Sequence, residues 1–221
     1  MEWPKDRRIH VDQLTPQEAV QVMELTECIE RIIIHLQLCL GLRRVEVLQM
    51  KVSDIMLGYI NILGKGRLGR KRRTSPFHRD TTVELSYHHR IMEVEVSKMR
   101  RKNPDVVIPD SPHIYERAGQ LHAYKRSFVD KVMARVSKKL GRKLTNHTLR
   151  RTFGRLLWLA GVPLETIKEI LGHEDTKIMV LYLGLNMDDK ADAMSRLADY
   201  TDALKRAKTD EARWKSGQSG I

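Results

Sequence analysis

Apolar residues recur every three or four positions along most of this chain, a spacing that predicts a mainly helical protein. The first helix is expected to begin with a capping box formed by Thr15 and Glu18 and to continue unbroken until Gly41. Further helices are expected at 43–50, 83–101, 121–140, 147–160, 164–171 and 175–184. The chain therefore has the pattern of one large, mostly helical domain.

A small β element interrupts this helical pattern. Residues 55–63 have the composition of a strand, glycines follow as turn residues, and the chain is expected to return as a second strand near 72–78. Segment 102–120 contains three prolines and is expected to be mainly loop. The predicted fold class is mainly α with a small antiparallel β-sheet or hairpin (α+β).

The domain boundaries follow from the same pattern. Residues 1–13 are polar and are expected to be flexible, and residues 14–186 form the main domain. Residues 187–221 are expected to form a helical tail with a disordered end, because apolar residues such as Met194 and Leu197 follow helical spacing. That apolar stripe is expected to pack into a groove, either on its own domain or on another copy of the chain.

The charge of the chain indicates an anionic partner. Its 221 residues include 40 Lys and Arg against 28 Asp and Glu, a net charge of +12. A soluble chain this basic usually binds a polyanion, although a merely basic soluble protein is the alternative. The polar N-terminus and the short apolar run 32–42 indicate neither a signal peptide nor a membrane span, so a cytoplasmic location is expected.

The two cysteines are not expected to form a disulfide. Cys28 and Cys39 fall in one predicted helix, where eleven residues correspond to about 16 Å. A disulfide needs Cα atoms within about 7 Å. Both are therefore predicted to be reduced thiols in the core.

Basic residues gather at the tip of the predicted hairpin. Six cations fall within nine residues with no acid among them: Lys65, Arg67, Arg70, Lys71, Arg72 and Arg73. Such a run either is solvated or faces phosphates. Arg43 and Glu46 lie three apart after Gly41, so Glu46 could orient the guanidinium, or the two could be an ordinary surface ion pair.

The strongest chemical signal lies between His147 and Tyr182. His147 and Arg150 share one face of a helix, His173 follows a glycine at another helix end, and Tyr182 comes nine residues later. Arginine grips phosphate oxygens, histidine moves protons near neutral pH, and tyrosine can carry a phosphoryl group covalently. The other histidines, including the His88–His89 pair, lack companions at metal-ligand spacing, and no metal is expected.

These motifs together resemble the catalytic domain of the tyrosine recombinases, the phage integrase family. The resemblance is carried by Gly-Leu-Arg43-x-x-Glu46, by Gly64-Lys65-Gly66, by His147-Thr-Leu-Arg150 and by Leu171-Gly172-His173 followed by Tyr182. It spans roughly residues 14–185, and the motifs occur in the family's order at compatible spacings.

The resemblance implies a site-specific recombinase or integrase that cleaves and rejoins double-stranded DNA without ATP, metal or other cofactor. Arg43 and Arg150 would clamp the scissile phosphate, and Tyr182 would attack it to form a 3′-phosphotyrosine. Lys65 would protonate the leaving oxygen, with Lys71 as a rival. His147 would help to deprotonate the tyrosine and would hydrogen-bond the phosphate together with His173, while Glu46 would hold the geometry.

The resemblance also implies partners. Arg151, beside the clamp, and the basic hairpin residues would contact DNA, and the tail would dock onto a neighbouring protomer to give a homo-oligomer, a tetramer on DNA. The source would be a prokaryotic cell, or a virus or mobile element within it. Two alternatives stay open: a monomeric type IB topoisomerase, and a non-catalytic DNA-binding protein on the same scaffold.

Overall fold

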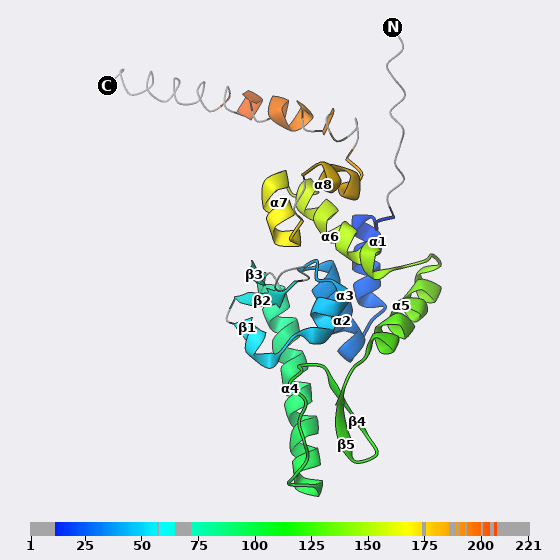
Figure 1. The fold of residues 1–221 in the computed structure, drawn as a ribbon. Helices are drawn as coiled ribbons and strands as arrows, with labels where there is room; N and C mark the ends of the chain where they lie inside the picture. Colours follow the sequence, from blue (N-terminus) through cyan, green and yellow to red (C-terminus); the bar gives the residue numbers. More distant parts are fainter. Residues whose placement is uncertain are drawn as a thin grey trace, which may run out of the picture. The chain divides into compact units, whose positions relative to one another are not determined.

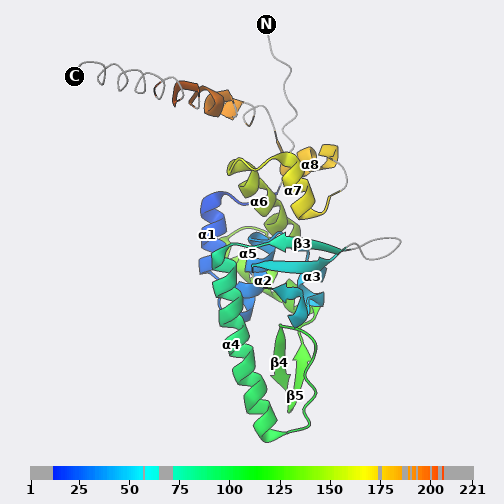
Figure 2. The same ribbon diagram turned by 90° about the vertical axis from the view of Figure 1, so that its left-hand side faces the viewer.

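The structure of the chain is a computed structural model that describes residues 12–56, 58–64, 72–173, 176–185, 189, 191–192, 194–199, 201–203 and 206. The chain divides into two compact units, Val11–Leu183 and Met1–His10 with Gly184–Ile221. Helices α1–α8 and strands β1–β5 all belong to the first unit (Figures 1 and 2).

Helix α1 (Pro16–Glu24) begins with the predicted capping box. The Thr15 hydroxyl accepts a hydrogen bond from the backbone N–H of Glu18 at 3.1 Å, and the Glu18 carboxylate accepts one from the Thr15 N–H at 2.8 Å. Two backbone donors that a helix start leaves unpaired are thereby satisfied.

The prediction of one helix as far as Gly41 is wrong, because α1 ends at Glu24 and a separate helix, α2 (Cys28–Leu38), follows. Between them the Thr26 hydroxyl donates to the carbonyls of Val22 and Met23, at 3.2 and 3.0 Å. This local bonding competes with continued helix formation.

The two cysteines flank α2 rather than lining the core. Cys28 and Cys39 are free, as predicted, but both are exposed. The expectation of core thiols is therefore wrong: Cys28 is the first residue of α2 and Cys39 is its C-cap, so each lies at an end of the helix.

A three-stranded antiparallel sheet follows α3 (Arg44–Gln49) and a short 3₁₀ turn, η1 (Val52–Asp54). Its strands are β1 (Ile55–Met56), β2 (Tyr59–Leu63) and β3 (Arg72–Pro76), in that order. The predicted strand 55–63 is wrong in one respect: the chain reverses at Gly58, where φ is +82°, so that Ile55 pairs with Ile60. The predicted return strand is confirmed, because β3 pairs with β2 from Tyr59–Pro76 to Leu63–Arg72.

A second hairpin lies where a loop was expected. After α4 (Arg79–Lys102), strands β4 (Ile114–Arg117) and β5 (Gln120–Ala123) pair across Ala118 and Gly119, both with positive φ. Paired positive φ values are typical of the tight turn that joins two strands. The hairpin packs beside the far half of α4 (Figures 1 and 2), where Met99 meets Ile114 and Leu121.

Four helices complete the first unit: α5 (Arg126–Leu140), α6 (Asn146–Leu159), α7 (Leu164–Leu171) and α8 (Thr176–Leu183). They confirm the predicted helices, except that α5 starts later because its expected first residues belong to β5. Gly154 lets α6 approach its neighbours, since a Cβ there would lie 2.6 Å from Leu183 and 3.0 Å from Leu171. Close packing of α6, α7 and α8 is what brings distant motifs together.

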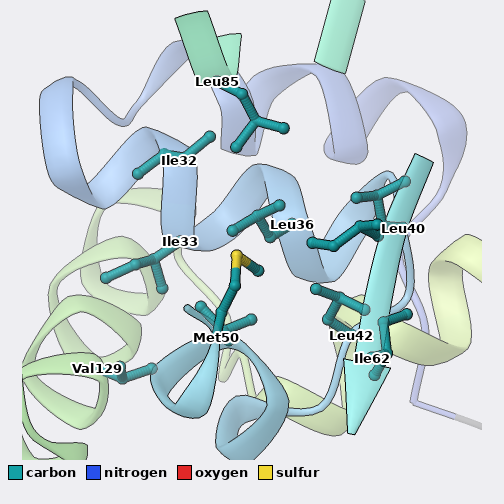
Figure 3. Close-up of a cluster of buried hydrophobic side chains, with 11 residues drawn as sticks. Ile32, Ile33, Leu36, Leu40, Leu42, Met50, Ile62, Leu85 and Val129 are labelled. Carbon is teal, nitrogen blue, oxygen red and sulfur yellow. The ribbon is translucent and has the colours of Figure 1, made fainter. Parts of the chain in front are cut away.

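Helix α2 is the centre of the core and contacts α1, α3, α4, α5 and α6. One face, including Ile33 and Leu36, packs with Leu42, Ile62 and the side chains around them (Figure 3). Its other face, with Ile34 and Leu38, packs against α1, α5 and α6 in a second cluster. A helix that is apolar on all sides has to be buried in this way.

The segment that enters the first unit is fixed to α6. The Asp12 carboxylate accepts hydrogen bonds from the Thr148 hydroxyl and, at 3.0 Å, from Arg142. Two residues on, the buried N–H of Leu14 donates to the Thr152 hydroxyl at 2.8 Å. Residues 12–14 are thus attached to the first two turns of α6.

In the second unit, the described residues 191–192, 194–199 and 201–203 are helical. Met194 is 65% exposed and Leu197 is 53% exposed. The predicted disordered end lies outside the described residues. Across the described part of the chain, none of the helices combines the length and apolarity needed to cross a membrane.

Candidate active site

Five of the six predicted catalytic residues lie in the described part of the chain, and they come from distant segments. Arg43 is the N-cap of α3, His147 and Arg150 lie in the first turns of α6, His173 follows α7, and Tyr182 is in α8. Lys65 lies outside the described residues. The site therefore depends on how α3 meets the helices α6–α8.

Arg43 is held by Glu46 at the start of α3. The Glu46 carboxylate accepts hydrogen bonds from the Arg43 backbone N–H at 2.8 Å and from its guanidinium at 2.9 Å. The Arg43 side chain remains 33% exposed, whereas that of Glu46 is 3% exposed. The pair is thus no ordinary surface ion pair: its acid is buried and its base reaches the surface.

A second arginine, from strand β3, completes the bonding of Glu46. Arg73 donates two hydrogen bonds to the two carboxylate oxygens, at 2.8 and 3.0 Å. Burial alone would raise the pKa of Glu46, but the hydrogen bonds and charge of Arg73, with smaller contributions from Arg43 and Arg150, lower it to about 2. Glu46 is therefore ionised at neutral pH.

Arg150 is buried at the base of the site. Its guanidinium donates to the carbonyls of Gly41 and Leu171 and lies 3.9 Å from the Glu46 carboxylate. Burial, followed by the charge of Arg43, lowers the pKa of Arg150 to about 10, so the group is still charged at neutral pH. Its two carbonyl contacts fix it between the end of α2 and the end of α7.

An open cavity of about 810 Å³ lies in front of these groups. Arg43, Glu46, His147 and Arg150 line it together with Arg44, Val45, Gln49, Leu63, Gly64, Arg126, Thr145 and Asn146. His147 is exposed at this wall. Partial desolvation and the charges of Arg151 and Arg150 lower the pKa of His147, so it is mostly neutral at pH 7 and can accept a proton.

His173 and Tyr182 meet on the α7–α8 side of the site. Their ring centroids are 4.8 Å apart and the rings are inclined by 53°. His173 is positioned by the end of α7, where its backbone N–H donates to the Lys168 carbonyl at 3.0 Å. Burial and the charges of Arg150, Arg43 and Arg73 lower the pKa of His173 to about 4, which leaves it neutral at pH 7.

The Tyr182 hydroxyl is buried, and within the described part of the chain it has no hydrogen-bond partner in standard geometry. Burial raises its pKa, while the charges of Arg150, Arg151 and Arg43 act in the opposite direction. The group is thus a protonated phenol beside guanidiniums. A hydrogen-bonding interaction with the Arg150 side chain also lowers the pKa of this phenol, so Arg150 is its nearest polar neighbour of known effect.

The residues predicted to contact DNA fall into four groups. Arg67, Arg70 and Lys71 lie outside the described residues, and Arg72 is exposed at the start of β3. Arg73 is turned inward to Glu46, with 13% of its side chain exposed. The guanidinium carbon of Arg151 lies 5.2 Å from the centre of the Tyr182 ring, a cation–π contact.

The arrangement as a whole is an anion site with a neighbouring nucleophile. Three guanidiniums and one carboxylate leave a net charge of +2 around Glu46. Guanidiniums bind phosphate oxygens in pairs. Neutral His173 lies beside the phenol ring, and neutral His147 lies on the cavity wall. Among the described residues, no three His, Cys, Asp or Glu side chains are grouped as metal ligands would be.

Sequence reasoning missed the inward role of Arg73. A signal was present in the alternation along β3, because Arg73 shares a face with the buried Ser75, while Arg72 and Thr74 point outward. In the register of the sheet, Arg73 is opposite the buried Ile62. Treating the six cations as one hairpin tip obscured that pattern.

Comparison with known proteins identifies relatives of the chain. Residues 12–189 match the phage integrase family. The chain is 26% identical over 196 residues to the tyrosine recombinase XerD of Staphylococcus haemolyticus, covering 82% of this chain and 61% of that protein. It is 24% identical over 200 residues to the tyrosine recombinase XerA of Pyrococcus furiosus, covering 87% and 64%.

Solved structures show the same fold. A crystal structure of XerA recombinase superposes with a TM-score of 0.66 at 21% identity, covering 83% of this chain and 64% of that one. The XerH recombinase in a post-cleavage complex with its difH substrate superposes at 0.63 with 23% identity, covering 83% and 52%. The chain spans about three-fifths of the length of the two curated relatives.

Proposed function

Because the chain belongs to the phage integrase family, we propose that it cleaves and rejoins DNA strands by site-specific recombination, through a bond between Tyr182 and a DNA phosphate. The observation that carries the proposal is that Arg43 and Arg150, from α3 and α6, meet at one buried carboxylate, and that both arginines act on the phenol of Tyr182 from α8. Related recombinases have been solved with their DNA substrates before and after cleavage, which supports DNA as the partner.

The cleavage step uses the two guanidiniums as a clamp. Arg43 and Arg150 bind the non-bridging oxygens of the scissile phosphate and stabilise the additional negative charge of the pentacoordinate transition state. The Tyr182 oxygen forms a bond to phosphorus, and the bond from phosphorus to the 5′ oxygen breaks. The products are a 3′-phosphotyrosine and a strand with a free 5′-hydroxyl.

The proton of Tyr182 has to leave as the new bond forms. The pKa of the phenol is raised by burial, so at neutral pH it reacts only with a base nearby. His147 is neutral and lies on the cavity wall, where it can accept this proton and hydrogen-bond the phosphate. His173, beside the Tyr182 ring, is neutral and can hydrogen-bond the phosphate.

The leaving 5′ oxygen needs a proton donor, because an alkoxide is a strong base. We assign this role to Lys65, with Lys71 as the second candidate. Lys65 follows directly on Leu63 and Gly64, which line the cavity. Rejoining is the reverse reaction, in which a 5′-hydroxyl attacks the phosphotyrosine, so the cycle needs no ATP.

Trapping the covalent intermediate tests the proposal. A DNA substrate nicked near the cleavage site loses a short fragment after attack and leaves the protein attached to DNA as an SDS-resistant adduct. Tyr182→Phe should abolish the adduct and change DNA affinity less than about threefold, because the hydroxyl is a nucleophile and not a binding group. DNA binding without any adduct from the wild-type chain would contradict the proposal and favour an inert DNA-binding protein.

A two-site substrate separates recombination from strand relaxation. We expect exchange of strands between the two sites, with the protein assembled as a homo-oligomer on DNA in the cytoplasm of a prokaryotic cell. Relaxation of supercoiled DNA without any exchange would instead indicate a type IB topoisomerase.

We assign the oligomer contact to the tail from residue 187 onward. Its Met194 and Leu197 are exposed apolar side chains at helical spacing. Met194→Ser combined with Leu197→Ser should lower the yield of the protein tetramer on two-site DNA in a crosslinking assay, while single-site binding is kept. An unchanged tetramer yield would place the contact elsewhere.

A further inference from the structure

Arg73 occupies a position that neither the clamp nor the nucleophile explains. It lies on β3, the strand that follows the basic sequence 65–71, and its side chain points to the buried face of the sheet, opposite Ile62. An arginine on a buried face is uncommon unless it is paired. Its partners therefore show what it does.

The guanidinium of Arg73 joins three elements. Two of its nitrogens donate to the Glu46 carboxylate of α3, and its Nε donates to the Ile170 carbonyl in the last turn of α7, at 3.2 Å. A Cβ on Gly172 would lie 3.3 Å from the Arg73 side chain, so the arginine passes directly against the end of α7. The next residue after Gly172 is His173.

The charges of the cluster explain why such a residue is needed. Glu46 holds Arg43 in place, but its negative charge also reduces the positive potential that a phosphate would meet. With Arg73 the cluster of three guanidiniums and one carboxylate carries +2, and without Arg73 it would carry +1. The transition state of the proposed reaction gains negative charge, so this difference acts mainly on the rate of cleavage.

We propose that Arg73 is a positioning residue of the DNA-cleaving site: it offsets the negative charge of Glu46, so that the positive potential of Arg43 and Arg150 at the phosphate is not reduced, and it ties β3 to the end of α7 beside His173. The inference rests on the proposed function and deepens it. Arg73 does not contact the phosphate. It acts through Glu46 and through the placement of two elements.

The test compares single and double variants in single-turnover cleavage of the nicked substrate. Arg73→Gln should lower the cleavage rate constant about 100-fold, in the range found when a transition-state hydrogen-bond donor is removed, and should change DNA affinity less than about threefold. Adding Glu46→Gln to Arg73→Gln restores the net charge of +2. The double variant should therefore cleave about tenfold faster than Arg73→Gln.

A matched control is offered by Arg31. This arginine also bonds a carboxylate and a backbone carbonyl, those of Glu84 at 2.7 Å and Met23 at 3.4 Å, but between α2 and α4 and away from the site. Arg31→Gln should cleave at the wild-type rate. A cleavage rate of Arg73→Gln equal to that of Arg31→Gln, or a double variant no faster than Arg73→Gln, would overturn the proposal.

A readout without DNA separates this inference from the proposed function. Carboxyl titration by NMR, on the full chain with ¹³C-labelled glutamate, should find Glu46 ionised down to pH 3 in the wild type and in Arg31→Gln. In Arg73→Gln, Glu46 should protonate well above pH 3. If it does not, Arg73 is not the group that neutralises Glu46, whatever the chain does to DNA.

Folding provides the remaining outcome. Should Arg73→Gln fail to fold, folding of the double variant would show that loss of the Arg73 charge and hydrogen bonds at the Glu46 carboxylate was the cause, as the inference requires. If neither variant folds while Glu46→Gln does, Arg73 serves the fold through another contact and the inference is wrong.

Discussion

At the scale of single residues, the candidate site consists of guanidiniums arranged around one buried carboxylate. Its local parts could be predicted from the sequence: Glu46 lies three residues after the N-cap Arg43, and His147 and Arg150 lie three apart in the first turns of α6. Arg73 could not be assigned in the same way, because its partner is 27 residues away and only the strand register decides which way it points.

Glu46 makes the stability of the fold depend on pH. Its pKa is about 2 in the folded chain, against 4.5 ordinarily, so its contribution is complete above pH 4.5 and is lost as the pH falls toward 2. The shift corresponds to about 3 kcal/mol. Between pH 5 and pH 2, the free energy of unfolding should fall by about 3 kcal/mol more in the wild type than in Glu46→Gln.

Denaturant unfolding at several pH values measures this difference. Glu95→Gln is the control, since Glu95 lies on α4 in an exposed pair with Lys98. This control should follow the wild-type curve. Parallel curves for the wild type and Glu46→Gln would mean that the carboxyl is not held in its ionised form by the fold.

At the scale of elements, periodicity located most helices but not their interruptions or the shortest strands. The pattern continues across the break at Thr26, where one hydroxyl ends the helix by bonding backbone carbonyls. The strands β4 and β5 have four residues each, too few for alternation to stand out against the neighbouring prolines. The first error comes from local bonding that competes with a wider pattern, and the second from strands too short to show a pattern.

The N-terminal cap of α6 stabilises the first turn of the helix that carries His147. The Thr145 hydroxyl accepts the N–H of Thr148 at 3.0 Å, the same kind of cap that Thr15 provides for α1. Thr145→Ala and Thr15→Ala should each lower the free energy of unfolding by about 1 kcal/mol.

Only Thr145→Ala should also slow cleavage, because fraying of that first turn displaces His147. Denaturant unfolding and the rate of adduct formation measure the two effects. Equal cleavage rates for the two variants would show that the cap of α6 serves stability alone.

At the scale of the whole molecule, the meeting of the motifs could not be derived from spacing. Arg43 and Arg150 are 107 residues apart, and they approach because α2 packs against both α3 and α6. The family resemblance supplied that arrangement, and the structure supplies its physical basis in close helix packing at Gly154. The net charge of +12, by contrast, indicated a polyanionic binding partner from composition alone.

DNA affinity should depend steeply on salt, because cations released from DNA on binding contribute to the free energy. Changing Arg70, Lys71 and Arg72 to Gln should reduce the slope of log K against log salt by up to about 2.7, or about 0.9 for each phosphate that a basic side chain no longer neutralises. The matched variant changes Arg100, Arg101 and Lys102, exposed at the far end of α4, and should leave the slope unchanged. Equal slopes for the two variants would place the hairpin away from DNA.

The attachment of residues 12–14 to α6 has a mechanical consequence. Asp12 bonds Thr148 and Arg142, and Leu14 bonds Thr152, so the chain enters the first unit at the foot of the helix that carries His147 and Arg150. A pull on the polypeptide ahead of residue 12 would be delivered to that helix before it reached α1. The entry point is therefore coupled mechanically to the helix that carries two of the residues proposed to act on the phosphate.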